Sequence, residues 1–419
     1  METLERTTTD HTLTTGMDFY KPTMSQLAYK TEPNVDATFT FKNRGSQRLA
    51  NYINPTELQQ RFDDLQHRGW TEGEISYLGS LTMSDGEPTF DDDYLEHLAT
   101  SELPPVTVSF DEKQDDIAIE TTGDWSMATF WETVVMGEVN EMYFENYLKQ
   151  WDIDPQTIYD EADRRLDQKI AILQQNPGIK IVDFGTRRHF SAKWQEYVVG
   201  RLAEECPGNL LGTSNVALAE KLGIKPIGTF AHEMPMMYAG LADARTGGDT
   251  DAIRRSHNRM LRDWYDQYGT DYSVALTDTF TSKFFFKDFT PEQAKAWRGV
   301  RHDSGDPIEF GEQLIQFYED NGVDARDKTI VFSDGLDIDQ IVKLYQHFEG
   351  RINMAFGWGT TLTNDMGMGL KALNIVMKAT HVWDRVAEVG ADNAKLSDNV
   401  GKHTGPNQKI KQYETAFAA

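Results

Sequence analysis

A histidine with a carboxylate beside it stands where a strand and a helix are expected to meet. His232 follows a short, largely apolar run, residues 224–230, and Glu233 comes directly after it. Pro235 lies three residues beyond the histidine, where a helix can begin. An imidazole has an unperturbed pKa of about 6.5, so it can act as a base or accept a phosphoryl group. His232 is therefore a candidate for chemistry, although a lone histidine is also common as a structural side chain.

The segment before it has the same form. A Gly-Thr-Ser-Asn sequence, residues 212–215, follows a strand-like run and leads into a helical stretch, residues 216–222, which Gly223 ends. Consecutive parallel strands bring their carboxyl ends to one edge. Ser214 and His232 are therefore expected to face one shared space.

Two late loops are suited to an anion. Residues 333–335 (Ser-Asp-Gly) and 357–361 (Gly-Trp-Gly-Thr-Thr) each follow a strand-like run. Glycines let backbone N–H groups approach an anion, and the last two loops of a barrel often hold phosphate. Ordinary glycine turns are the alternative. The P-loop pattern is absent from the sequence, so ATP binding by that device is not indicated.

An arginine stands beside an acidic loop. Asp303, Ser304 and Asp306 follow Arg301 closely. Such oxygen ligands suit Mg²⁺ with a phosphorylated substrate, and an arginine can meet a phosphate as a planar fork. A turn stabilised by Asp and Ser side chains is the alternative.

Two adjacent arginines end another strand-like run, residues 179–184. Arg187 and Arg188 are expected at a helix start, where the helix dipole disfavours cations, so they point mildly to an anionic ligand. Near the N-terminus, Phe19 and Tyr20 could stack on an aromatic ring, with simple packing as the alternative.

The elements that must position these residues alternate from residue 179 onward. Further strands are predicted at residues 272–276, 300–302, 329–332 and 352–356, and helices at 190–202, 253–268, 291–297, 308–319 and 337–348. Alternation of this kind predicts parallel strands with crossover helices. A (β/α) barrel and an open doubly wound sheet both fit. The barrel is favoured because polar loops follow nearly every strand, and in a barrel all of them converge on one mouth.

The first part of the chain has a different pattern. Strands are predicted at residues 36–41, 106–110 and 116–120, and helices at 55–68, 91–98 and 130–148. We expect an α+β domain that could cover the barrel mouth. The predicted boundaries are residues 1–150 for this domain, 151–395 for the barrel and 396–419 for a polar, partly mobile tail, part of which could join the first domain.

The composition of the 419-residue chain narrows the classes of protein. Apolar residues make up 39% of it, enough for a folded core, and the length suggests two domains. The formal net charge of −26 repels nucleic acid and anionic membranes, so neither is an expected partner. Small anionic substrates are compatible with this net charge, because their binding needs only a few positive groups at the site.

The single cysteine and the lack of targeting segments favour a cytoplasmic location. Cys206 cannot form an internal disulfide, and near a helix end we expect it to be structural rather than nucleophilic. Residues 1–16 lack the apolar core of a secretory signal, and no apolar run reaches the roughly 18 residues of a membrane span.

The order of these motifs resembles the nicotinate phosphoribosyltransferase family over nearly the whole chain. The matching segments are residues 18–24 (DFYKPTM), 130–133 (FWET), 140–141 (NE), 184–188 (FGTRR), 212–215 (GTSN), 228–233 (GTFAHE), 301–307 (RHDSGDP), 333–337 (SDGLD) and 357–360 (GWGT). Each motif alone is weak, but their order and spacing together are specific. Trp358 departs from the pattern, since a smaller apolar residue is expected there, and it could alter how its loop closes.

The resemblance implies an enzyme that transfers the phosphoribosyl group of phosphoribosyl diphosphate to nicotinate. The products would be nicotinate mononucleotide and diphosphate, at an entry step to NAD. The resemblance also implies ATP as co-substrate, Mg²⁺ as cofactor and assembly as a homodimer with shared sites. The implied fold is an α/β protein, an irregular (β/α) TIM-like barrel with an N-terminal α+β domain.

Roles for individual residues also follow from the resemblance. His232 would be the phosphorylated histidine, and Asp303 a second catalytic residue and candidate Mg²⁺ ligand. The nicotinate contacts would be Tyr20, Arg187, Ser214 and Thr229. Arg187 and Ser214 would receive the nicotinate carboxylate. The positions around the phosphoribosyl group would be Arg301, Asp303, Ser333, Asp334, Gly335, Gly357, Gly359 and Thr360.

Other functions stay open. A related enzyme could use nicotinamide, since an amide needs a neutral partner where a carboxylate needs a cation. A non-catalytic barrel that binds phosphosugars or a protein partner is a second alternative, although His232, Asp303 and both glycine loops speak against it. A barrel isomerase or synthase is a third, and it would not need a phosphorylated histidine.

Overall fold

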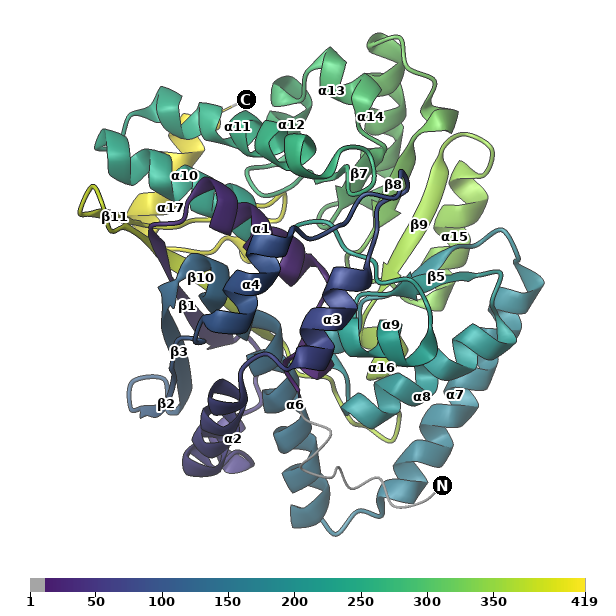
Figure 1. Ribbon diagram of the computed structural model, residues 1–419. Coiled ribbons are helices and arrows are strands. Elements are labelled where there is room, and N and C mark those ends of the chain that lie inside the picture. Colours follow the sequence, from purple (N-terminus) through teal and green to yellow (C-terminus); the bar gives the residue numbers. More distant parts are fainter. Residues whose placement is uncertain (1–11, 419) are drawn as a thin grey trace.

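The computed structural model describes residues 12–418, whose strands form two sheets (Figure 1). The expectation that the N-terminus is no secretory signal falls largely on residues 1–11, which lie outside the described residues. None of the described helices combines the length and the apolarity that crossing a membrane requires.

The first sheet is antiparallel. Its strands lie in the order β11 (Val389–Asp392), β10 (Ile375–Asp384), β1 (Val35–Asn43), β3 (Asp116–Asp124) and β2 (Val106–Asp111). Side chains alternate along β1, so that Val35, Ala37 and Phe39 are buried while the residues between them are partly exposed. This alternation is typical of a sheet with one face on the core.

The second sheet is parallel. Its strands lie in the order β5 (Leu210–Thr213), β4 (Ile181–Asp183), β9 (Asn353–Trp358), β8 (Thr329–Phe332), β7 (Gly299–His302) and β6 (Val274–Leu276). All four residues of β7 are buried, as expected for a strand covered on both faces. The predicted parallel α/β part is confirmed, and the strands predicted in the first part of the chain lie in the antiparallel sheet. A closed barrel is not found, because no ladder joins β5 to β6 among the described residues.

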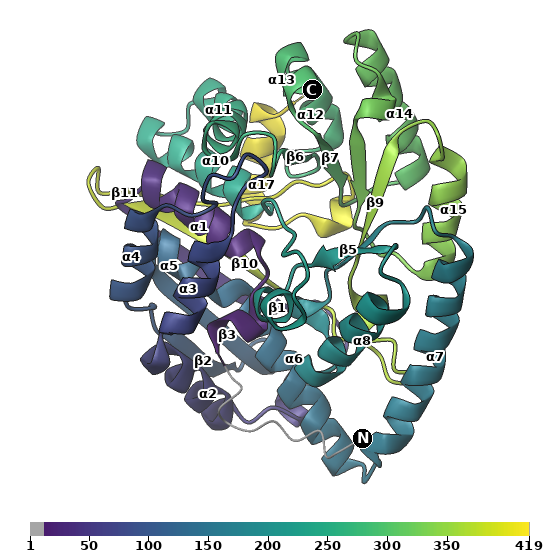
Figure 2. The same cartoon turned by 45° about the vertical axis from the view of Figure 1, so that its right-hand side comes forward.

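Helices pack against both sheets (Figures 1 and 2). Several begin where a capping Asp or Asn precedes a proline, as at Asn54–Pro55, Asp154–Pro155 and Asp306–Pro307. In the first part of the chain they are α1 (Tyr20–Thr31), α2 (Pro55–Arg68), α3 (Glu72–Ser80), α4 (Asp92–Thr100), α5 (Trp125–Ala128), α6 (Trp131–Gln150) and α7 (Pro155–Gln175). They continue with α8 (Ala192–Glu205), α9 (Val216–Leu222), α10 (Glu233–Thr246), α11 (Thr250–Tyr268), α12 (Ser282–Asp288), α13 (Pro291–Ala296), α14 (Pro307–Asp320), α15 (Ile338–Phe348), α16 (Thr360–Thr363) and α17 (Asn407–Ala416).

Helix α10 joins the two halves of the molecule. It packs against β10 and β11 of the antiparallel sheet and against α11. Its first residue follows His232, which also contacts loops of the parallel sheet. The amino end of α10 is therefore held by both sheets.

One local prediction is wrong. Residues 224–230 do not form a strand but run as an irregular segment with one isolated bridge, between Thr213 and Pro226. The tail contains helix α17, which lies beside α11 and buries Tyr413 and Phe417. Its few apolar residues lie on one face, and there the ring of Phe417 stacks on Phe280 with centroids 3.8 Å apart.

The antiparallel sheet combines distant parts of the chain. β10 pairs with β1 from Val35–Asp384 to Asn43–Ile375. The predicted domain boundaries at residues 150 and 395 place residues 35–43 and 375–392 in different domains, although both segments lie in the same sheet.

Candidate active site

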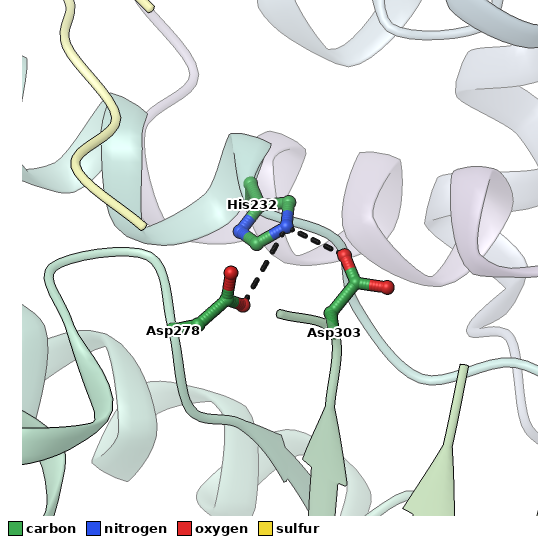
Figure 3. Close-up of side chains that lie close together, drawn as sticks. All are labelled: His232, Asp278 and Asp303. Atoms are coloured by element: carbon green, nitrogen blue, oxygen red, sulfur yellow. Dashed lines mark hydrogen bonds and ion pairs between the residues drawn. The ribbon is translucent and has the colours of Figure 1, made fainter. Parts of the chain in front are cut away.

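His232 occupies the position before the first turn of α10, as its neighbouring Glu233 and Pro235 suggest. The side chain is buried, with 5% of the residue exposed. Two aspartates from the parallel sheet face it, Asp278 after β6 and Asp303 after β7 (Figure 3). The carboxyl ends of two strands and the start of one helix thus meet at one imidazole.

The imidazole is held at both nitrogens. Nδ1 lies 2.9 Å from Thr279 Oγ1, and Nε2 lies 2.9 Å from Asp303 Oδ2 and 3.7 Å from Asp278 Oδ1. Burial, reinforced by the charge of Lys395, lowers the pKa of His232 to about 4. The ring is therefore neutral near pH 7 and keeps one nitrogen lone pair for chemistry.

Asp303 fixes which nitrogen carries the proton. Burial opposes its ionisation, but the charge of Arg301 and the hydrogen bond from His232 hold its pKa well below the usual value. An ionised carboxylate only accepts hydrogen bonds, so His232 Nε2–H donates to Asp303 Oδ2. Nδ1 is then the acceptor, and the hydroxyl of Thr279 donates to it.

The neighbouring aspartate belongs to a second network. Asp278 Oδ2 accepts hydrogen bonds from Ser304 Oγ at 2.6 Å and Ser397 Oγ at 3.2 Å, and Lys395 Nζ lies 3.3 Å from it. The pKa of Asp278 is lowered by His232 and Lys395, against the effect of burial. Sequence reasoning missed this residue, although a polar Thr-Asp-Thr sequence directly follows the predicted strand at residues 272–276. The contribution of Lys395 carried no signal in the sequence.

Arg301 and Ser333 continue the site along the sheet. Arg301 Nε donates to Ser333 Oγ at 2.9 Å, and its terminal nitrogen lies 3.3 Å from Asp303 Oδ1. Ser333 Oγ lies 2.8 Å from the same Asp303 oxygen. The guanidinium carbon of Arg301 lies 5.8 Å from the ring centroid of Phe184. The structure thus brings Arg301, Asp303 and Ser333 together with His232, as the sequence led us to expect.

The expected nicotinate residues also lie together within one chain. Arg187 Nε forms an ion pair with Asp18 Oδ2 at 3.1 Å, and Ser214 Oγ donates to Asp18 Oδ1 at 2.6 Å. The guanidinium of Arg187 lies 5.6 Å from the ring centroid of Tyr20. Arg187 and Ser214 are therefore spaced to hold one carboxylate between them, here that of Asp18.

The other two expected nicotinate contacts are Tyr20 and Thr229. The Tyr20 hydroxyl is buried without a hydrogen-bond partner among the described residues, and burial raises its pKa well above the usual value. Thr229 contributes its carbonyl, which accepts from Thr23 Oγ1 at 3.0 Å. The tyrosine ring is held next to Arg187, while a role of the Thr229 side chain stays a prediction.

The glycine loops differ from each other. A Cβ at Gly357 would lie 2.4 Å from the ring of Phe184, and one at Gly359 would lie 3.0 Å from the Phe184 carbonyl. Gly335 has a φ of +59° and open space around it. The loop at residues 357–361 therefore needs glycine for close packing under Phe184, and the loop at residues 333–335 needs it for a turn. Phe184 was not singled out as a candidate residue.

Other members of the loops have partners outside them. Asp334 Oδ1 lies 2.6 Å from Lys402 Nζ, so the tail covers this part of the site. Trp358 is buried and donates to Thr361 Oγ1 at 2.6 Å, which shows how a large residue fits the loop. Thr360 is the first residue of α16, and it is half-buried.

Cations gather on this side despite the acidic chain. Burial, with Arg187 and Arg44 nearby, lowers the pKa of Arg188 to about 10. Such mutual repulsion is costly unless an anion relieves it. The arginines therefore favour an anion at this place, and its binding by Arg187 and Arg188 stays a prediction.

The acidic groups could hold a divalent cation. Ligand atoms of His232, Asp278 and Asp303 lie within 4.8 Å of one another. Asp278 Oδ1 is buried and accepts no hydrogen bond from any described residue. Carboxylate oxygens are the ligands that Mg²⁺ prefers, so the two aspartates fit this ion better than the histidine nitrogen does.

Cys206 lies apart from these residues. It follows the end of α8, where its buried Sγ lies 3.8 Å from the Ile170 carbonyl. Burial raises the pKa of its thiol, which disfavours the reactive thiolate.

The fold and the site define an α/β protein with clustered arginines and a neutral histidine at the carboxyl ends of parallel strands. Comparisons with known proteins specify the class. Residues 179–419 match the nicotinate phosphoribosyltransferase (NAPRTase) family, and residues 15–140 match the N-terminal domain of that family.

Solved structures give the same result. A nicotinate phosphoribosyltransferase from Porphyromonas gingivalis is 29% identical, with a TM-score of 0.81 over 98% of this chain and 100% of that one. Another from Vibrio cholerae is 28% identical, with a TM-score of 0.84 over 97% of this chain and 93% of that one. The chain belongs to the nicotinate phosphoribosyltransferase family.

Proposed function

We propose that the protein transfers the phosphoribosyl group of phosphoribosyl diphosphate to nicotinate, with ATP hydrolysis driving the reaction through phosphorylation of His232. The observation that carries the ATP-dependent step is the buried, neutral imidazole held between Thr279 and Asp303. Family membership supports the overall reaction, which makes nicotinate mononucleotide and diphosphate for NAD biosynthesis.

Nicotinate would bind beside Tyr20. Its carboxylate would meet Arg187 and Ser214, which already bracket the carboxylate of Asp18. An arginine at this place favours nicotinate over nicotinamide, because an amide offers no charge to the guanidinium. The substrate carboxylate must displace Asp18 or share Arg187 with it.

The phosphoribosyl group would lie over the next strands. Arg301 and Ser333 offer donors to its oxygens, and the loops at Gly335 and Gly359 let the backbone approach. As the bond to diphosphate breaks, negative charge builds on the leaving group and positive charge on the ribose carbon. Fixed cations such as Arg301 and Lys402 stabilise that separation without reorganising.

Phosphorylation would use the lone pair of His232. The ring nitrogen takes the terminal phosphoryl group of ATP, and ADP leaves. The lone pair is that of Nδ1, so the Thr279 hydroxyl gives up its hydrogen bond as the N–P bond forms, while Asp303 keeps hold of Nε2–H. Lys395 lies where it can neutralise part of the added charge. Mg²⁺, held by Asp303 and Asp278, would neutralise phosphate oxygens of the substrates. Hydrolysis of the phosphohistidine would then relax the site for product release.

The expected fold and assembly belong to the same proposal. We propose that the parallel sheet is an irregular, TIM-like barrel in which residues 224–232 fill the place between β5 and β6. Ile227 N donates to Thr213 O at 2.8 Å at one end, and His232 reaches Thr279 at the other. A crystal structure with this segment away from β6 would refute it. A cytoplasmic homodimer stays a prediction, which light scattering and cell fractionation would check.

The variant His232→Ala tests the ATP-dependent step. It should lose ATP hydrolysis and ATP stimulation but keep slow phosphoribosyl transfer, because Tyr20, Arg187 and Arg301 are untouched. Phosphorylation by labelled ATP and product formation are measured side by side. Full ATP stimulation in the variant would refute the role of the histidine.

A further inference from the structure

A buried network of two lysines and two glutamates connects the nicotinate side of the site to His232. Lys21 follows Tyr20 in α1, and its Nζ lies 2.5 Å from Glu132 Oε2 and 2.6 Å from Glu233 Oε2. Lys378 Nζ on β10 lies 2.9 Å from the other Glu132 oxygen. The side chains of Lys21, Glu132 and Glu233 are at most 3% exposed.

Each charge in this network has a defined partner. Glu233 Oε1 accepts from Trp125 Nε1 at 2.7 Å, and Lys21 Nζ lies 3.2 Å from Thr129 Oγ1. The two positive charges balance the two negative ones. Buried ion pairs contribute little net stability, because desolvation offsets their attraction, but they hold their partners in place. Stability alone therefore does not account for the network.

The backbone before His232 is held against α1 as well. Thr23 Oγ1 donates to the Thr229 carbonyl at 3.0 Å, and Ala231 N lies 3.3 Å from Met24 Sδ. A Cβ at Gly228 would lie 2.8 Å from Tyr20 N. The segment leading to His232 and the start of α1 therefore have no room to slide past each other.

We infer that Lys21 and Glu233 are positioning residues that couple the state of His232 to the position of Tyr20 in the nicotinate pocket. This inference rests on the proposed function. Tyr20 and Lys21 are neighbours at the start of α1, and His232 and Glu233 are neighbours at the start of α10. The Lys21–Glu233 ion pair joins the two helix starts, so a phosphate on His232 that moves one must move the other. A phosphohistidine adds negative charge one residue before Glu233 in the chain, and its repulsion of that carboxylate is the force that acts on the pair.

The consequence is close coupling of ATP hydrolysis to product formation. With the ion pair in place, the phosphorylated state orders Tyr20 for nicotinate and turns over only when substrate is bound. Without it, the two events separate, and ATP is hydrolysed with no product. Neither residue touches substrate in this account.

The test compares Lys21→Met, Glu233→Gln and wild type. ATP hydrolysed and nicotinate mononucleotide formed are measured in the same reaction, with nicotinate, phosphoribosyl diphosphate and Mg²⁺ present. Lys21→Met should raise the ratio of ATP used to product formed about tenfold, within the usual range of coupling between sites. Glu233→Gln keeps an oxygen for Trp125 but loses the charge, so it should raise the ratio in the same direction. It also carries the test alone should Lys21→Met fail to fold.

Lys328→Met is the matched control. Lys328 is also a buried lysine, but it precedes β8 at the opposite end of the strands, where it donates to the carbonyls of Lys295 and Trp297. Its loss should lower the melting temperature and leave the ratio unchanged. A normal wild type together with an unchanged ratio in both test variants would overturn the inference alone. A wild type that forms no phosphohistidine would overturn the proposed function and the inference with it.

Discussion

Replacing Asp303 by asparagine tests how His232 is prepared for phosphorylation. The change keeps the shape of the side chain and removes its charge. The introduced amide would still accept from Ser333 and Arg301 through its oxygen, which turns its NH₂ group toward His232 Nε2. The imidazole must then carry its proton on Nδ1, toward Thr279, which is the opposite tautomer.

The magnitude follows from the lost charged hydrogen bond. A hydrogen bond to an ionised group contributes about 1.5–3 kcal/mol. Since about 1.4 kcal/mol corresponds to a tenfold change in rate, the phosphorylation of His232 should slow by roughly 10–150-fold. The pKa of His232 should fall below its wild-type value of about 4, because Asp303 raises it. Protonation of the ring at neutral pH therefore cannot explain the loss.

The assay is rapid quenching with γ-labelled ATP, scored as acid-labile phosphoprotein. Asp306→Asn is the control, because it makes the same chemical change in the same loop. Asp306 caps α14 through the backbone of Ile308 and Glu309, and asparagine caps as well as aspartate does. A wild-type phosphorylation rate in Asp303→Asn, or an equal loss in Asp306→Asn, would refute the reasoning.

Three further outcomes are expected. Arg187→Ala should raise the KM for nicotinate far more than that for nicotinamide, since only nicotinate carries the charge; equal losses would count against the nicotinate assignment. Burial lowers the pKa of His232 to about 4, so phosphorylation rates should be flat above about pH 5 and fall only below it; a fall centred near pH 6.5 would show an unperturbed histidine. Phe417→Ala removes a ring stacked on Phe280 and should lower the free energy of unfolding by about 3–5 kcal/mol in a denaturant titration, and an unchanged midpoint would show that α17 contributes nothing.

Local signals in the sequence predicted much of the fold. The helix at residues 55–68 and the strand at 329–332 have the bounds that their capping and apolar patterns suggested. β10 was not predicted from the sequence, and it pairs with β1, which lies far away along the chain, as in the pair Asn43–Ile375. Barrel closure was not predictable either. It depends on whether β5 and β6 meet, and no local pattern encodes that.

The candidate site was predictable where a polar or charged side chain directly follows a predicted strand. His232, Asp303, Arg301 and Ser333 come from polar loops after predicted strands, and the structure brings them within hydrogen-bonding distance. Lys395 could not be found this way, because it reaches Asp278 from an irregular segment after β11.

Residues in irregular backbone escaped prediction more generally. The segment at residues 224–230 has the apolar pattern of a strand, but tight contacts with α1, such as that of Gly228 with Tyr20, hold it in another conformation. Tertiary packing, rather than the local apolar pattern, therefore determines the backbone conformation of the segment that leads to His232.

The most direct test of the central claim is product formation by the purified protein. It is incubated with nicotinate, phosphoribosyl diphosphate and Mg²⁺, with and without ATP, and nicotinamide replaces nicotinate in a parallel reaction. Our account predicts nicotinate mononucleotide, formed faster with ATP, and little product from nicotinamide. Product from nicotinamide alone, or none from either substrate, would contradict it.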